Sequence, residues 1–114
     1  MTKWVVHFHP DFESEFDELP VRVQTRLLWT LKNISEAGPR LGRPFVDTLY
    51  GSSFPNMKEI RVQIDNAYWR FAFAFDPERN AVVLVGGNKG GETQDRFYRW
   101  LIRLADKRFM DWLE

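Results

Sequence analysis

The sequence predicts an α+β fold, in which a small, mostly antiparallel sheet is packed by a helical hairpin and a C-terminal helix. Apolar residues recur at helical spacing in three segments, and they alternate with period two in two segments of the second half. The predicted order of elements is β-αα-βββ-α. We expect residues 1–114 to form a single domain, because a chain of 114 residues has room for one core.

The first part of the chain predicts a strand followed by the helical hairpin. Residues 3–8 form the expected strand, and His9-Pro10 begins a helix because proline suits the first helical turn. Pro20 starts a second, longer helix that ends near Gly38. Each helix carries one apolar stripe, made of Phe12, Phe16 and Leu19 in the first and of Val23, Leu27, Leu31 and Ile34 in the second.

The remaining elements follow a loop over residues 40–56, which holds at most a short strand around 45–49. Residues 57–64 and 67–75 alternate with period two around a turn at Asp65-Asn66, which predicts a β-hairpin. Residues 81–85 are apolar on both faces, as in an interior strand. A glycine-rich loop over 86–91 lacks the spacing of a phosphate-binding motif and leads to a helix over 94–113.

The predicted hairpin fixes which side chains are neighbours. If Asp65-Asn66 is a two-residue turn, Arg61 lies directly opposite Arg70 on one face of the sheet. Ile60 then faces Phe71, and Val62 faces Trp69, on the other face, which we expect to be the core side. A slip of one residue would mix apolar and charged side chains on both faces, so the register is well specified.

The opposed arginines are the first candidate for a functional site. Like charges directly opposite on a sheet are destabilising, and the small Ala72 and Ala74 are expected to leave this face uncovered. Two guanidinium groups on an open floor suit a bound phosphate, with Lys58 and Lys89 at the rim. The alternative is that Glu59 bridges Arg61 and Arg70 in a solvated surface network. The pattern alone leaves both possibilities open.

Composition narrows the function classes. Sixteen basic and sixteen acidic residues cancel, which argues against a general nucleic-acid-binding protein but not against a local basic cleft. The chain has no cysteine and no apolar run long enough to span a membrane, so we expect a cytoplasmic protein. His7 and His9 share a strand face but lack a third ligand, so we expect no metal and no other cofactor.

Six segments of the chain together carry a resemblance to a known family. They are Gly42-Arg43-Pro44, Leu49-Tyr50-Gly51, Met57-Lys58-Glu59-Ile60-Arg61, Tyr68-Trp69-Arg70-Phe71-Ala72-Phe73, Leu84-Val85-Gly86-Gly87-Asn88-Lys89 and Ala105-Asp106-Lys107-Arg108. With these segments the sequence resembles the HigB-type, phage Gp49-like branch of the RelE/ParE toxin superfamily, and the resemblance spans nearly the whole chain.

This resemblance implies a RelE/ParE-like domain that acts as the toxin of a type II toxin–antitoxin pair. The implied activity is ribosome-dependent, metal-free cleavage of mRNA, which inhibits translation. The implied partners are a cognate antitoxin, often of the helix-turn-helix type, together with the ribosome and mRNA. Two alternatives stay open, namely a non-catalytic ParE-like inhibitor of DNA gyrase and a non-toxic relative that still binds an antitoxin.

The implied reaction assigns roles to several side chains. The resemblance places Arg61 and Arg70 at the phosphate-binding arginines of the family and Lys58 and Lys89 at positions where basic residues recur. Metal-free cleavage uses the 2′-hydroxyl of RNA as the nucleophile, so a base and an acid are also needed. Lys58 and Glu59 are the competing candidates for the base, and Tyr98 is the candidate acid. From the residues alone, Tyr50, Tyr68 and Tyr98 either pack in the fold or, near a basic floor, stack on a base or transfer a proton.

Overall fold

The computed structural model describes residues 3–114. Its elements in chain order are β1 (Val5–Phe8), α1 (Pro10–Phe16), α2 (Val21–Ala37), the short 3-10 helix η1 (Gly38–Arg40), β2 (Val46–Thr48), β3 (Met57–Ile64), β4 (Ala67–Phe75), β5 (Asn80–Asn88) and α3 (Gln94–Leu113). The predicted α+β class and the β-αα-βββ-α order are confirmed. The short strand expected around residues 45–49 is β2.

The five strands form one sheet in the order β1-β5-β4-β3-β2. β1 runs parallel to β5, and each other neighbouring pair is antiparallel. β5 lies between β1 and β4, so the segment predicted as an interior strand is one. A bulge where β4 passes from Ala72 to Phe73 shifts the register with β5, so Leu84 and Val85 both pack on the same side of the sheet.

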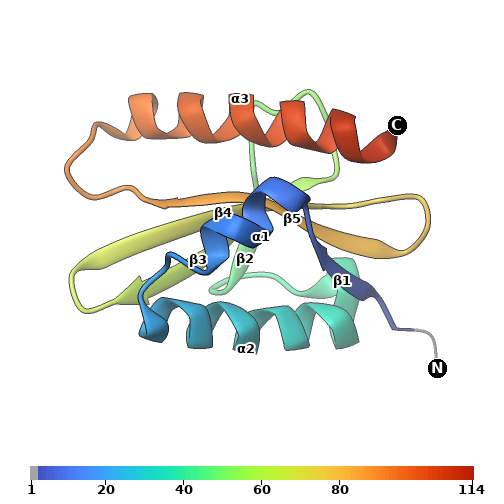
Figure 1. Cartoon of the computed structure of the whole chain (residues 1–114), viewed down its shortest axis with the longest axis horizontal. Coiled ribbons are helices and arrows are strands. Elements are labelled where there is room, and N and C mark those ends of the chain that lie inside the picture. The colour runs from blue at the N-terminus through green and yellow to red at the C-terminus, as the bar shows by residue number, and fades with distance from the viewer. Residues whose placement is uncertain (1–2) are drawn as a thin grey trace.

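Helices cover both faces of the sheet. Figure 1 shows α2 below the sheet and α3 above it, with α1 crossing in front. The face toward α2 forms one core, which includes Phe12, Leu27, Ile34, Ile60, Val62, Phe71 and Phe73. The face toward α3 forms a second core, which includes Met57, Ala72, Ala74, Val82, Leu84, Phe97, Leu101 and Phe109.

The second core corrects the expectation of an open face beside Ala72 and Ala74. Both alanines are completely buried beneath α3. The physical reason is complementary size, because small side chains on the sheet leave room for large ones such as Phe97 and Phe109 on the helix. Helix α3 therefore covers part of the sheet face that carries the two arginines.

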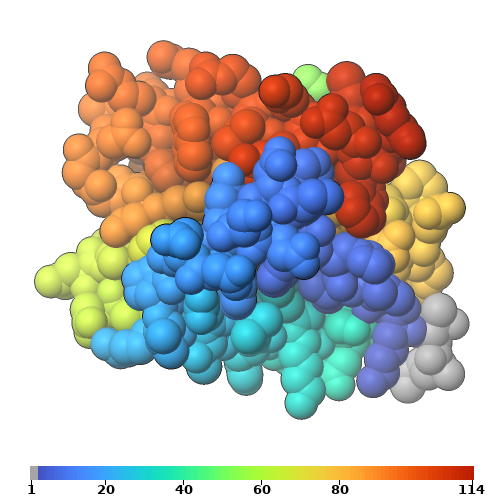
Figure 2. Space-filling model, viewed as in Figure 1, coloured from blue at the N-terminus to red at the C-terminus, as the bar shows by residue number. Residues whose placement is uncertain are grey.

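Arg108 links α3 to α1 across the middle of β5. Its Nη1 and Nη2 atoms donate to the two carboxylate oxygens of Glu15 at 2.8 and 2.7 Å, and Nη1 also donates to the backbone oxygen of Leu84 at 2.8 Å. The arginine is buried, whereas Glu15 is half exposed. In the space-filling view α1 fills the surface between α2 and α3 (Figure 2). The Arg108–Glu15 ion pair therefore holds α1 against α3.

His7 and His9, the two histidines considered as metal ligands, each have another contact in the fold. His9 is buried and caps α1, where its Nδ1 accepts a hydrogen bond from the backbone N–H of Asp11, and His7 packs against Trp112. Within residues 3–114, His, Cys, Asp and Glu side chains do not gather in a group of three able to hold a metal ion. Across the same residues, the helices are too short or too polar to cross a bilayer.

Candidate functional site

The predicted register of the β3–β4 hairpin is confirmed. Arg61 pairs with Arg70, and on the core side Ile60 pairs with Phe71 and Val62 with Trp69. Both arginines therefore project from the same face of the sheet, beside the first turns of α3.

The two arginines differ in exposure, which corrects the expectation of two guanidinium groups on an open floor. The Arg70 side chain is only 4% exposed. Its Nε donates to the Tyr98 hydroxyl at 3.2 Å, and its Nη1 donates to the backbone oxygen of Trp69 at 3.0 Å. Arg70 is buried because Tyr98 of α3 lies over it. Arg61 lies beyond that cover and keeps 27% of its side chain exposed.

Glu59 joins these side chains in a buried hydrogen-bonded cluster. Its Oε2 accepts from Arg61 Nη1 at 2.9 Å, and its Oε1 accepts from the Tyr98 hydroxyl at 2.7 Å. Arg70 Nε lies 3.9 Å from the same Oε1. Glu59 thus bridges the two arginines, as the alternative interpretation of the sequence proposed, but it is 5% exposed and not part of a solvated surface. Hydrogen bonds to a buried charge are strong and directional, so the cluster fixes the position of Arg61.

Arg61 opens into a cleft of about 460 Å³, which we call the Arg61 cleft. It lies between the β3–β4 hairpin, the loop around β2 and the start of α3. Its lining residues are Arg43, Asp47, Thr48, Leu49, Tyr50, Glu59, Arg61, Lys89, Gln94, Asp95 and Tyr98. The cleft combines a fixed guanidinium, an ammonium, a phenol and a carboxylate, which are the groups that acid–base chemistry on a phosphate ester needs.

Lys89 and Tyr98 have altered proton affinities in this cleft. Burial lowers the pKa of Lys89, and the nearby positive charges of Arg70 and Arg61 lower it further. Burial raises the pKa of Tyr98, and its hydrogen bond to the Glu59 carboxylate adds to the effect. The Lys89 Nζ lies 6.0 Å from the centre of the Tyr98 ring. The cleft therefore holds a lysine that gives up its proton more readily than usual and a tyrosine that retains its own.

The structure does not bring Lys58 into the Arg61 cleft. Lys58 pairs with Phe73, whose ring belongs to the core on the α2 side. Successive side chains of a strand point to opposite faces, so Lys58 lies on the other face from Glu59 and Arg61. Lys58 therefore lies on the wrong face of the sheet to serve as the base in this cleft. Lys89, expected only as an RNA-binding residue, is the lysine beside Arg61.

A second hollow adjoins the Arg61 cleft, and sequence reasoning named several of its residues without bringing them together. It has a volume of about 400 Å³ and is lined by Arg26, Arg43, Pro44, Phe45, Arg61, Gln63, Tyr68 and Arg70. We call it the Tyr68 hollow. Arg43 and Arg61 line both hollows, so the two are adjacent. Arg43 stood in the Gly42-Arg43-Pro44 segment of the resemblance, but Arg26 comes from the apolar-striped α2 and gave no signal.

Comparison with known proteins identifies the family. A family model described as phage derived protein Gp49-like (DUF891) matches residues 14–110. The chain belongs to this Gp49-like family. All residues that line the Arg61 cleft lie within the matched region, residues 14–110.

Two curated proteins of Mycobacterium tuberculosis (strain ATCC 25618 / H37Rv) are similar to this Gp49-like chain, and both are named as toxins. HigB3 is 47% identical over 104 residues, which cover 91% of the chain and 89% of HigB3. HigB2 is 43% identical over 81 residues, which cover 70% of the chain but only 40% of HigB2.

A solved structure supports the fold assignment. The Escherichia coli toxin RelE, in the free state and with two of its arginines replaced by alanine, matches with a TM-score of 0.61. The match covers 90% of this chain and 96% of RelE, at 14% sequence identity. At that identity the likeness establishes a RelE-like fold for the Gp49-like chain, and the roles of individual residues have to be argued from their own geometry.

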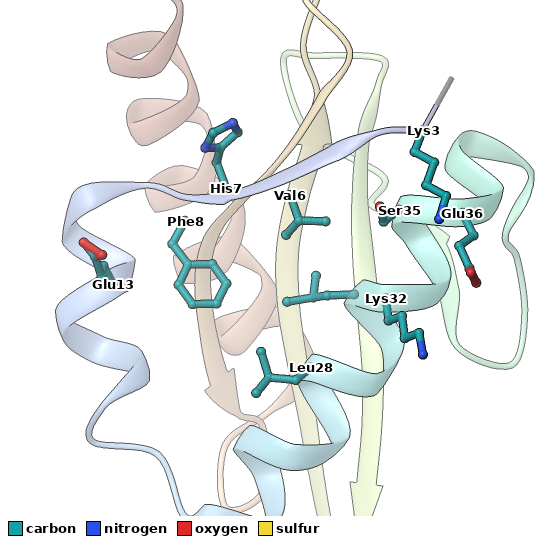
Figure 3. Close-up of a pocket in the computed structure, with 10 residues that line it drawn as sticks. Lys3, Val6, His7, Phe8, Glu13, Leu28, Lys32, Ser35 and Glu36 are labelled. Carbon is teal, nitrogen blue, oxygen red and sulfur yellow. The ribbon is translucent and has the colours of Figure 1, made fainter. Parts of the chain in front are cut away.

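The Gp49-like chain also carries an apolar groove on the α2 side of the sheet, remote from the arginines (Figure 3). Val6 and Phe8 of β1 extend toward Leu28 of α2 across the groove, while Lys32 and Glu36 stand at its rim. The groove lacks the convergent polar groups of the Arg61 cleft. The Arg61 cleft, where titratable side chains contact one another, is therefore the candidate functional site.

Proposed function

We propose that this chain is the toxin of a type II toxin–antitoxin pair and that it cuts mRNA at the ribosome without a metal ion. Its similarity to the HigB toxins over most of its length supports the toxin role. The observation that carries the nuclease activity is the position of Arg61, which the buried Glu59 holds at the junction of two hollows beside Lys89 and Tyr98.

Arg61 is suited to bind the phosphate that is cut. A guanidinium has five N–H donors, and Arg61 commits Nη1 to Glu59. The remaining donors are available for a phosphate oxygen, and they are already oriented before the substrate arrives. A donor fixed in this way stabilises the extra negative charge of the pentacoordinate transition state without the cost of reorganisation.

Lys89 is suited to remove the proton of the 2′-hydroxyl. Its lowered pKa raises the fraction of neutral amine near neutral pH, and a neutral amine can accept a proton. In this proposal the proton moves to the Lys89 Nζ as the 2′-oxygen forms a bond to phosphorus. Glu59 is a weaker candidate for the base, because both its oxygens already accept hydrogen bonds from Arg61 and Tyr98.

Tyr98 is suited to protonate the leaving group. The raised pKa keeps the phenol protonated near neutral pH, and the departing 5′-oxygen is far more basic than a phenolate. The bond from phosphorus to the 5′-oxygen breaks as this oxygen takes the Tyr98 proton. The products are a 2′,3′-cyclic phosphate and a free 5′-hydroxyl. Arg70 does not touch the substrate in this scheme and acts as a positioning residue for Tyr98.

The proposed partners are a cognate antitoxin of the helix-turn-helix type, together with the ribosome and its mRNA. The chain has no net charge, and the ion pairs of Arg61 with Glu59 and of Arg43 with Asp47 offset much of the charge in the Arg61 cleft. Tight binding to free RNA depends on uncompensated positive charge. A requirement for the ribosome, which would present the mRNA, agrees with this modest local charge.

Cell-free translation tests the proposal against the gyrase alternative. Purified chain is added to a translation reaction, and the 5′ ends of the mRNA are mapped by primer extension. A parallel reaction measures supercoiling of plasmid DNA by gyrase. We expect cuts in translated mRNA and unchanged supercoiling. Intact mRNA together with loss of supercoiling would contradict the nuclease proposal.

A further inference from the structure

We infer that the Tyr68 hollow binds a second nucleotide of the RNA, the neighbour of the nucleotide whose phosphate lies at Arg61. Tyr68 stacks on its base, and Arg26 and Arg43 hold its phosphate. This inference rests on the proposed function, since it assigns a place to the rest of the single-stranded substrate.

The charge of the hollow points to an anion. Four arginines line it, and no carboxylate does among the residues that the structure describes. Arg43 shares its charge with Asp47, where its Nη2 lies 2.7 Å from Oδ2. Over residues 3–114, Arg26 has no carboxylate within ion-pair distance. Arg61 and Arg70 share the Glu59 carboxylate, so Arg26 is the arginine of the hollow whose charge a phosphodiester would balance.

The aromatic side chain in the hollow points to a nucleobase. The Tyr68 side chain belongs to the large exposed hydrophobic residues of the chain, with 41% of the residue accessible. It lies directly opposite Gln63 on β3, so a phenol ring and an amide stand side by side at the sheet surface. An aromatic ring stacks on any base, and an amide can both donate to and accept from the edge of a base.

The placement of the hollow suits a nucleotide next to the reacting one. Arg43 and Arg61 line both the hollow and the Arg61 cleft, so the hollow is the adjoining space for the next nucleotide of a strand bound at Arg61. Single-stranded RNA is usually bound by such a combination of a basic path and an aromatic platform. Pro44 and Phe45 complete the wall on the side of β2.

Binding of short RNA to the purified chain tests the inference. The probe is a fluorescein-labelled 2′-O-methyl hexanucleotide, which lacks the nucleophilic hydroxyl, together with variants that are abasic at one position each. Fluorescence anisotropy at low salt gives the Kd for the wild type, Tyr68→Ala and the matched control Tyr68→Phe, which keeps the ring.

We expect one abasic position to weaken binding to the wild type by roughly 5- to 150-fold, the usual range for loss of one base–aromatic stack. Tyr68→Ala should lose the same factor with the intact probe and lose nothing more with that abasic probe. Tyr68→Phe should behave as the wild type. Arg26→Ala should reduce the slope of log K against log salt by about 0.7, as expected for one lost phosphate contact on a single strand.

Two outcomes would overturn the inference. One is that Tyr68→Ala binds every probe as the wild type does, and the other is that the wild type does not bind the hexanucleotide even at low salt. The proposed function is judged separately in cell-free translation. If the wild type and Tyr68→Ala cut the same codons at the same rate, the second nucleotide site is wrong while the nuclease stands. If the wild type cuts no mRNA, the proposed function itself is wrong.

Discussion

Arg61 and Arg70 lie directly opposite each other on β3 and β4, yet they meet different environments, with side-chain exposures of 27% and 4%. Tyr98 covers Arg70 and leaves Arg61 accessible. The two positive charges are tolerated as neighbours because the Glu59 carboxylate lies against both of them. The two opposed arginines therefore have separate tasks. Arg61 faces the cleft, and the buried Arg70 holds Tyr98 in position.

Substitution of each arginine by alanine should separate these tasks in a stability measurement. Arg70→Ala should lower the free energy of unfolding by about 2–3 kcal/mol, because it leaves the buried Glu59 and Tyr98 short of a partner. Arg61→Ala should cost about 1 kcal/mol, because Arg61 and Glu59 both line the cleft and water can take the place of the Arg61 donor at Glu59 Oε2. Urea denaturation followed by circular dichroism measures both. Equal losses would contradict the division of tasks.

Lys89→Arg should reduce mRNA cutting by about 10²–10⁴-fold, the usual contribution of a general base. Arginine keeps the positive charge but cannot give up its proton. Lys58→Arg is the matched control, because Lys58 lies on the opposite face of the sheet, and it should cut normally.

The pH dependence of cutting gives a second test of Lys89. The base must be neutral to accept a proton, so the rate of the wild type should rise with pH and level off above the pKa of Lys89. That pKa is lowered, so the plateau should be reached below the pH at which an ordinary lysine titrates. Cutting by Lys89→Arg at the wild-type rate, with the same pH profile, would remove Lys89 from the mechanism.

Arg108→Met should destabilise the fold by about 2–3 kcal/mol. Breaking a fully buried ion pair typically costs about 3–5 kcal/mol, and the smaller figure reflects the half-exposed Glu15. Arg103→Met, at an exposed position of the same helix, is the control and should change stability little. Thermal unfolding measures the difference. An unchanged Tm for Arg108→Met would show that α1 is held by its apolar contacts alone.

Asp76 should make the fold sensitive to acid. Burial raises the pKa of Asp76, but hydrogen bonds from Trp112, Asn80 and the backbone N–H of Glu78 outweigh this effect and leave the pKa below its ordinary value. The folded state therefore binds the proton less readily than the unfolded chain. The stabilisation is complete above the unfolded pKa of about 3.9 and is lost as the pH falls toward the folded pKa.

Asp76→Asn tests this acid sensitivity. We expect the variant to be less stable than the wild type at pH 7 by about 2 kcal/mol, since the new amide group opposes the donors of Asn80 and Trp112. The gap between the two proteins should narrow as the pH falls below about 4, the range in which the carboxylate takes up its proton. Asp111→Asn, at an exposed position, should show no such change. A gap that stays constant with pH would contradict the role of the Asp76 charge.

The sequence alone predicted the elements around the hairpin well. The β3 and β4 bounds and the Arg61–Arg70 pairing followed from strict alternation and a two-residue turn, because a register slip would have exposed apolar side chains. The bounds of α3 were also correct. These features are local, so periodicity and turn chemistry were sufficient.

The burial of Arg70 beneath Tyr98 could not be predicted from periodicity and turn chemistry, since it depends on where α3 docks. One clue was present. A strand that is apolar on both faces, as β5 is, requires cover on both sides of the sheet, and Ala72 and Ala74 were small enough to admit a helix. Strand alternation would also have excluded Lys58, whose position differs by one residue from Glu59. Arg26 gave no clue, because its approach to β3 depends on how α2 packs.

The most direct test of the account is the rate of mRNA cutting in cell-free translation by Arg61→Ala, compared with the wild type and with Arg99→Ala, an exposed arginine on α3. We predict a loss of about 10²–10³-fold for Arg61→Ala, as for removal of one preorganised charge-stabilising donor. The wild type and Arg99→Ala should give equal rates and fragments ending in a 2′,3′-cyclic phosphate. Cutting by Arg61→Ala at the wild-type rate would contradict the assignment of the Arg61 cleft as the catalytic site.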